Sequence, residues 1–204
     1  MKFSSVLGLA LAALSSSAMA AVTTFTNRAS WESQVFNETT MTFEGCTVPQ
    51  TGSQANLCGS GNTFSTTAGT GLFVGTNSFG FPGSILQAQD NSHNVTIHVV
   101  LGSPASAVGL DASVLGTGSN FTIAISPTET FSFPSGNSAI PTTYKFGGII
   151  ADHTFSSFDI NEVGAVGMVV DNLSLASAVP LPGIAWLLLW GLGFLGVRMG
   201  RRSA

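Results

Sequence analysis

The chain has 204 residues, of which 44% are hydrophobic and only 8% are charged. Four of its six basic residues lie near the two ends. The region between them contains two basic residues, Arg28 and Lys145, and ten acidic residues. Two bases against ten acids give this region a net charge of minus eight. A chain without a basic patch cannot neutralise phosphates, so composition excludes a nucleic-acid-binding protein.

The N-terminus has the layout of a secretory signal peptide. Lys2 precedes an apolar run over residues 6–14, and Ala18-Met19-Ala20 follows as an A-x-A cleavage site. The run is well short of the ~20 residues that a membrane span needs. Residues 1–20 are therefore predicted to direct the chain to the Sec translocon and to be removed after Ala20.

Residues 21–178 have the length of one domain. They are rich in Thr, Ser, Gly, Asn and Phe, a composition that favours short strands joined by turns. The one predicted helix is early, in "RASWESQVF", where Thr26 or Asn27 serves as N-cap and Trp31 and Val35 share a face.

Cys46 and Cys58 are the only cysteines and bracket a polar loop. In an oxidising compartment they are expected to form a disulfide, which would stabilise the fold by about 3 kcal/mol in the chain-entropy picture. The alternative, a metal site, would need a second pair of cysteines that the chain lacks.

Apolar residues alternate with polar ones in several later segments, which predicts strands that are buried on one face. The chain has no comparable helical pattern between these segments, so the fold class is predicted to be all-β, a sandwich or jelly roll. The segments are "NVTIHVVL" (Val95, Ile97, Val99), "FTIAIS" (Phe121, Ile123, Ile125), "TFSF" (Phe131, Phe133) and the closing "AVGMVVDNLSL".

The C-terminal region, 179–204, begins with Val179, Pro180, Leu181 and Pro182. The apolar run over residues 183–199 would span roughly 25 Å as a helix and is predicted to cross the inner membrane. By the positive-inside rule the basic end, including the tail 200–204, stays in the cytoplasm. A buried core helix is the alternative, but the arginines that follow argue against it. The expected anchoring residues are Trp186, Trp190, Arg198, Arg201 and Arg202.

This order of prolines, apolar span and arginines resembles the PEP-CTERM sorting signal of Gram-negative bacteria, with Leu181 where that signal most often has Glu. The resemblance implies an exosortase that cuts near residues 179–182; a generic C-terminal anchor is the alternative. "FTNRASWESQV", "TMTFEG" and "KFGGIIADHTFSSFDI" also resemble the exported domain of such proteins. This second resemblance implies a jelly-roll-like β-sandwich and no particular reaction.

Two binding sites are predicted. Glu44 near the first strands and Asp171 with Asn172 in the last would meet in a jelly roll and offer oxygen ligands to a structural calcium ion. The alternative is that these residues simply cap strand ends in water. Phe79 and Phe81, among Gly, Asn and Ser, are the candidates for a sugar-stacking platform; the alternative is that they belong to the core.

The chain has no recognisable nucleophile or metalloprotease motif, so it is not expected to be an enzyme. The resulting hypothesis is an exported, exosortase-processed protein of the cell envelope or extracellular matrix. The resemblance implies that it associates with exopolysaccharide, because PEP-CTERM systems commonly accompany exopolysaccharide production. A calcium-stabilised carbohydrate-binding module is one alternative. A secreted glycan hydrolase, acting through a carboxylate pair, is the other.

Overall fold

The computed structural model describes residues 21–46, 48–67, 71–77, 80–89, 94–115, 120–137 and 143–179. The expected signal peptide and the expected membrane helix at 183–199 lie outside these residues. Within the part described, no helix is long and apolar enough to cross a membrane. The described chain is mainly strand, with two short helices, which confirms the all-β prediction.

The strands join into a single hydrogen-bonded sheet of thirteen. The elements are β1 (Val22–Phe25), α2 (Arg28–Glu32), β2 (Val35–Met41), β3 (Val48–Thr51), β4 (Ser53–Gln54), the 3₁₀ turn η2 (Leu57–Gly59), β5 (Thr63–Thr66), β6 (Leu72–Thr76), β7 (Ser84–Gln89), β8 (Asn94–Leu115), β9 (Asn120–Ser126), β10 (Glu129–Pro134), β11 (Gly136–Asn137), β12 (Lys145–Val163) and β13 (Gly167–Ala178).

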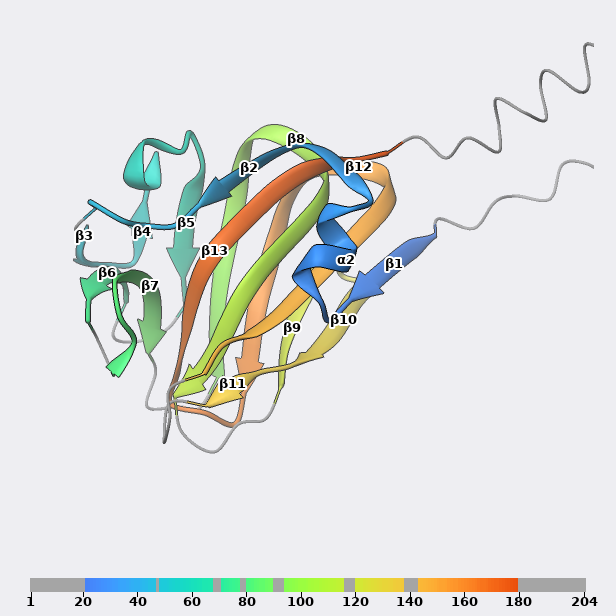
Figure 1. Cartoon of the computed structure of the whole chain (residues 1–204). Coiled ribbons are helices and arrows are strands. Elements are labelled where there is room, and N and C mark those ends of the chain that lie inside the picture. The colour runs from blue at the N-terminus through green and yellow to red at the C-terminus, as the bar shows by residue number, and fades with distance from the viewer. Residues whose placement is uncertain are drawn as a thin grey trace, which may run out of the picture.

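The long strands β8 and β12 extend through the whole sheet, which a break in their pairing divides into two parts (Figure 1). Their antiparallel pairing is interrupted between Ile150 and Phe155, where the ladder changes register. On one side of this break β12 and β8 continue to β9, β10 and β5. On the other side they continue to β1, β13, β7, β6 and β3, and β2 pairs with the end of β13. We call these the first and second halves of the sheet.

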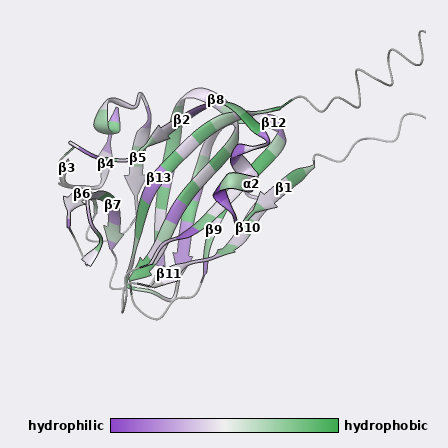
Figure 2. Ribbon diagram, in the orientation of Figure 1, coloured by the Kyte–Doolittle hydropathy of each residue, from purple (hydrophilic) through white to green (hydrophobic). Residues whose placement is uncertain are grey.

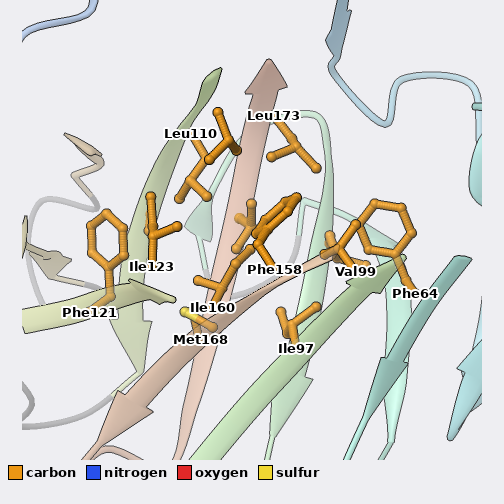
Figure 3. Packing of buried hydrophobic residues seen from close by; sticks show 14 of the residues in the cluster. Phe64, Ile97, Val99, Leu110, Phe121, Ile123, Phe158, Ile160, Met168 and Leu173 are labelled. Atoms are coloured by element: carbon orange, nitrogen blue, oxygen red, sulfur yellow. The ribbon is translucent and has the colours of Figure 1, made fainter. Parts of the chain in front are cut away.

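The main core lies between the two halves. Val99 and Phe158 of the first half pack in one cluster with Leu110 and Leu173 of the second (Figure 3). Hydrophobic and hydrophilic residues alternate along β8 and β13, as strands with one buried face require (Figure 2). The predicted inward faces of "NVTIHVVL" and "FTIAIS" are buried, and in "TFSF" Phe133 is buried while Phe131 packs partly against the core.

The helix begins where the sequence indicated but ends earlier. Asn27 is the N-cap, with its Oδ1 accepting a hydrogen bond from Ser30 N at 3.0 Å, as expected. The predicted continuation to Val35 is wrong, because Val35 begins β2 and pairs with Ala178 of β13. Hydrogen bonding to a neighbouring strand thus replaced a second helical turn.

Trp31 attaches the helix to the outer face of the second half. Its ring is fully buried, and its Nε1 donates to the carbonyl oxygen of Ile149 at 3.1 Å. The sheet beneath it is made of Gly109 and Gly148, where a Cβ would lie within 3.3 Å and 2.8 Å of the indole. The two glycines are opposite each other on β8 and β12, and because they lack side chains the Trp31 ring can pack directly against the backbone of the sheet.

The predicted disulfide is present between Cys46 and Cys58, with an S–S distance of 2.02 Å. It closes the segment that carries β3, β4 and η2, in which Leu57 is fully buried. This region has little regular structure of its own. The disulfide therefore restricts its conformations, as hydrophobic packing does in the rest of the domain.

Candidate functional site

Two residues of the predicted calcium site, Asp171 and Asn172, lie on the outer face of the second half, where β8 and β13 run side by side, and Glu44 lies in the turn after β2. Asp111 of β8 stands directly opposite Asp171 of β13. Like charges opposite one another in a ladder destabilise a sheet unless other groups compensate them. The compensating groups come from Arg28 of the helix and from Asn172.

Arg28 is the central cation of this face. Its Nη2 lies 3.1 Å from Asp111 Oδ2 and donates to the Asn172 carbonyl oxygen at 2.8 Å. Its Nη1 donates to Ser174 Oγ at 3.1 Å, and its guanidinium carbon lies 4.8 Å from the ring centroid of Phe146. The planar guanidinium thus bridges β8 and β13 while stacking on an aromatic ring.

Asn172 interrupts the ladder of β13 with a left-handed backbone, φ 47°. Its backbone N–H donates to Asp171 Oδ1 at 2.7 Å, and its side-chain Nδ2 donates to Asp111 Oδ2 at 2.9 Å. The register shifts between Asp171 and Ser174. Asn tolerates this conformation better than most residues. Asn172 therefore suits this position both through its backbone conformation and through the hydrogen bond of its side chain.

The charge of Asp171 is poorly compensated. Burial raises the pKa of its carboxyl to about 6, against the lowering effect of the hydrogen bond from the Asn172 amide. The negative charges of Asp111 and Glu44 raise this pKa further, and Arg28 lowers it. Glu44 therefore acts electrostatically on Asp171.

Two further groups complete the setting of this face. Glu44 Oε1 accepts a hydrogen bond from the backbone N–H of Ser84 at 3.0 Å. Burial, followed by the charges of Asp171 and Asp111, raises the pKa of the Tyr144 hydroxyl, which keeps it protonated. The face is thus rich in oxygen atoms and net negative, which suits a hard cation better than an anion. Among the described residues, however, no three His, Cys, Asp or Glu side chains converge as a metal-binding group.

The predicted sugar platform is not formed by Phe81. Its side chain is 1% exposed and packs with Ile85, Leu115 and Val169, while its ring lies 4.6 Å from that of Tyr144. A buried ring has no free face for a sugar, so Phe81 is a core residue of the outer face. Phe79 lies outside the described residues.

The sorting motif meets the described domain at one residue. Val179 is exposed, and its backbone N–H donates to the Gln34 carbonyl oxygen at 3.2 Å, directly after β13 ends at Ala178. The motif therefore begins where the sheet's hydrogen bonding stops. Outside the described residues lie Pro180, Leu181, Pro182, Trp186, Trp190, Arg198, Arg201 and Arg202.

A second polar site, which the sequence did not single out as a unit, lies on the outer face of the first half. His98 of β8 and Asp159 of β12 are directly opposite, and His98 Nδ1 is hydrogen-bonded to Asp159 Oδ1. Both side chains remain exposed, at 45% and 41%. They line a hollow of about 480 Å³, together with Ser126, Thr130 and Ser157 among others. Only the strand pairing brings these residues together; the alternation of "NVTIHVVL" shows just that His98 points away from the core.

No family model matches the chain, and none of the curated proteins matches it. Among solved structures it is similar to the catalytic domain of a GH87 α-1,3-glucanase in complex with tetrasaccharides. That match has a TM-score of 0.39 and 13% identity, and covers 72% of this chain and 29% of that chain. A second structure of such a domain, also with tetrasaccharides, matches with a TM-score of 0.35 and 13% identity over 78% of this chain and 28% of that chain. The chain spans less than a third of either structure, and a likeness this low carries no argument about function.

Proposed function

We propose that the chain is an exported, non-enzymatic protein of the cell envelope or extracellular matrix that associates with exopolysaccharide. Its domain is a β-sandwich of jelly-roll type. A C-terminal PEP-CTERM-like signal holds it at the inner membrane until an exosortase cuts near residues 179–182. The observation that carries this proposal is the run of prolines, apolar residues and arginines at the C-terminus, joined to a strand that ends directly before it.

The position of the two ends of the described domain supports a membrane tether. The start of β1 and the end of β13 lie at the same end of the sheet (Figure 1). Ala21 N donates to Asp152 Oδ2 at 2.9 Å, so cleavage after Ala20 would place a new ammonium group beside a carboxylate. The signal peptide, before its removal, and the C-terminal segment would thus leave the domain from one end.

Intact mass of the native protein, recovered from envelope and culture supernatant, tests this proposal. The expected mass corresponds to a chain that starts at Ala21 and ends between Val179 and Pro182. A variant with Pro180 and Pro182 replaced by Ala should accumulate in the membrane fraction with its C-terminus intact. Native protein that extends to Ala204, or that retains Met1, would overturn the proposal.

A carbohydrate-binding module is the second candidate, favoured by the hollow around His98 and Asp159. An imidazole and a carboxylate that are both partly exposed, with serine and threonine hydroxyls beside them, can donate to and accept from sugar hydroxyl groups. Sedimentation of the protein with purified exopolysaccharide tests this role. Asp159→Ala should reduce binding, whereas Glu32→Ala, an exposed change on the helix, should leave it unchanged. Equal binding by both variants would exclude this hollow as the binding site.

A further inference from the structure

Three side chains on the outer face of the second half have buried polar atoms without a hydrogen-bond partner. They are Gln87, of which neither amide atom is paired, Ser113, whose Oγ is unpaired, and Tyr144, whose hydroxyl is unpaired. Gln87 and Ser113 are both 0% exposed. Leaving a buried polar group unpaired costs roughly 1–3 kcal/mol each, and native proteins rarely do so. A polar occupant at this place would satisfy these groups.

Strand register puts these groups close together. Val169 of β13 is opposite Gln87 of β7 on one side and opposite Ser113 of β8 on the other. Because side chains alternate, all three share the outer face with Asp171, two residues farther along β13. The intervening Val170 belongs to the main core on the opposite face. Asp171 is a diagonal neighbour of both Gln87 and Ser113, about 7–8 Å from each at the backbone, a separation that long side chains can span.

Two aromatic rings lie beside Val169, the residue that separates Gln87 from Ser113. Tyr144 packs against the cluster of Val169, Phe81, Ile85 and Leu115, with its ring 4.6 Å from that of Phe81. Its hydroxyl interacts electrostatically with both Asp171 and Asp111. Tyr144 thus links the Val169 cluster to the two aspartates of this face.

The charge of the face indicates the kind of occupant. Glu44, Asp111 and Asp171 bring three carboxylates, and Arg28 forms an ion pair with Asp111. Arg28 is held by Asp111, Ser174 and the Asn172 carbonyl, so it does not serve Asp171 as an ion-pair partner. Two negative charges remain, which matches a divalent cation.

We propose that this place is a calcium site in which Asp171 supplies the charged ligand and Gln87, Ser113 and Tyr144 supply neutral oxygen atoms. Calcium accepts six to eight oxygen ligands in flexible geometry, including amide and hydroxyl oxygens and water, whereas magnesium demands a near-ideal octahedron. This ligand set differs from the one expected from the sequence. Asn172 Nδ2 is engaged with Asp111, and Glu44 Oε1 with Ser84, so Glu44 contributes charge at longer range. The proposal does not depend on the function proposed above.

Terbium luminescence and thermal unfolding of the full chain test the site directly. Tb³⁺ substitutes for Ca²⁺, and Tyr144, the only tyrosine of the chain, would lie next to it as the energy donor. Excitation of the protein should produce Tb³⁺ emission that Ca²⁺ competes away, and Ca²⁺ should raise Tm relative to a chelator. Asp171→Asn should weaken Ca²⁺ binding by at least about tenfold, while the matched control Asp159→Asn, on the other half of the sheet, should bind like the wild type.

Ser113→Ala provides a second variant that removes one neutral ligand with little change of volume. It should weaken Ca²⁺ binding without abolishing it. No protein-sensitised Tb³⁺ emission together with an unchanged Tm would overturn the proposal and leave ordered water as the occupant. Wild-type Ca²⁺ affinity in both Asp171→Asn and Ser113→Ala would also overturn it, because the cation would then bind elsewhere.

Discussion

Arg28 and Asp111 join the N-terminal helix to the middle of the sheet, with 3.1 Å between Nη2 and Oδ2. Their side chains are 24% and 18% exposed, so solvent screens this pair less than it screens an ordinary surface ion pair. The same guanidinium reaches β13 through the Asn172 carbonyl oxygen and Ser174. One side chain from the start of the domain therefore holds together two strands that are central to its second half.

Arg28→Ala should lower the free energy of unfolding by about 2 kcal/mol, because it leaves Asp111 shielded from water without its cation. Arg28→Lys should recover only part of the loss, since an ammonium group cannot span Asp111, Ser174 and the Asn172 carbonyl as a planar fork does. Urea unfolding measures both values. Lys145→Ala, at an exposed basic residue, is the control and should change stability by less than about 0.5 kcal/mol.

Gly148→Ala should destabilise the domain by about 2–4 kcal/mol. A Cβ there would lie 2.8 Å from both the Trp31 indole and the Phe146 ring, and both rings are buried. Gly52→Ala is the matched control, because nothing lies within 4 Å of a Cβ at that position. Thermal unfolding and Trp31 fluorescence should separate the two variants; equal Tm values would mean that the tryptophan does not rest on Gly148 as described.

Reduction of the Cys46–Cys58 disulfide should lower the free energy of unfolding by about 3 kcal/mol, as the chain-entropy model gives for a closed loop of this length. The double variant Cys46→Ser/Cys58→Ser should show the same loss without reductant. Unfolding curves with and without a thiol reductant measure the effect. If reductant also shifted the curve of the double variant, the loss could not be assigned to this bond.

Asp171→Asn should stabilise the calcium-free protein at pH 7 by about 1 kcal/mol, once solvent screening of this half-buried group is allowed for. The folded-state pKa of about 6 lies above the value of 3.8 for an unperturbed carboxyl, so the native state binds this proton more tightly. The loss of folding stability caused by burying the ionised Asp171 carboxylate is fully present above pH 6 and disappears below pH 4. The difference in Tm between variant and wild type, measured in chelator, should therefore shrink as the pH falls from 7 to 4.

A variant that is less stable than the wild type at both ends of this range would contradict that prediction. Such a result would mean that the hydrogen bond from the Asn172 amide to the Asp171 carboxylate outweighs the penalty of burying the charge.

The local patterns of the sequence were sufficient where one physical effect dominates. Alternation predicted the buried faces of "NVTIHVVL" and "FTIAIS" because a strand between core and solvent has period two. Asn27 was identified as a cap because its side chain satisfies an amide of its own helix. The disulfide followed from the presence of only two cysteines.

Patterns failed where a residue's partner is remote in the chain. Val35 fits a helical face, yet pairing with Ala178 drew it into β2. Phe81 lies among turn-forming residues, yet Tyr144 and Val169 bury it. The sequence did not predict that Gln87 and Ser113 are buried, because polar residues on the outer face of a strand are ordinarily exposed to solvent.

The sequence by itself determined the class of fold, the inward-facing strand positions, the helix start and the disulfide, because these depend on short-range periodicity, capping and covalent chemistry. Only the tertiary structure decided that Arg28 meets Asp111, that Asp171 faces Asp111 beside three unpaired polar groups, and that His98 pairs with Asp159. These relationships depend on strand register between segments separated by tens of residues, and register is set by the packing of the whole sheet around its core.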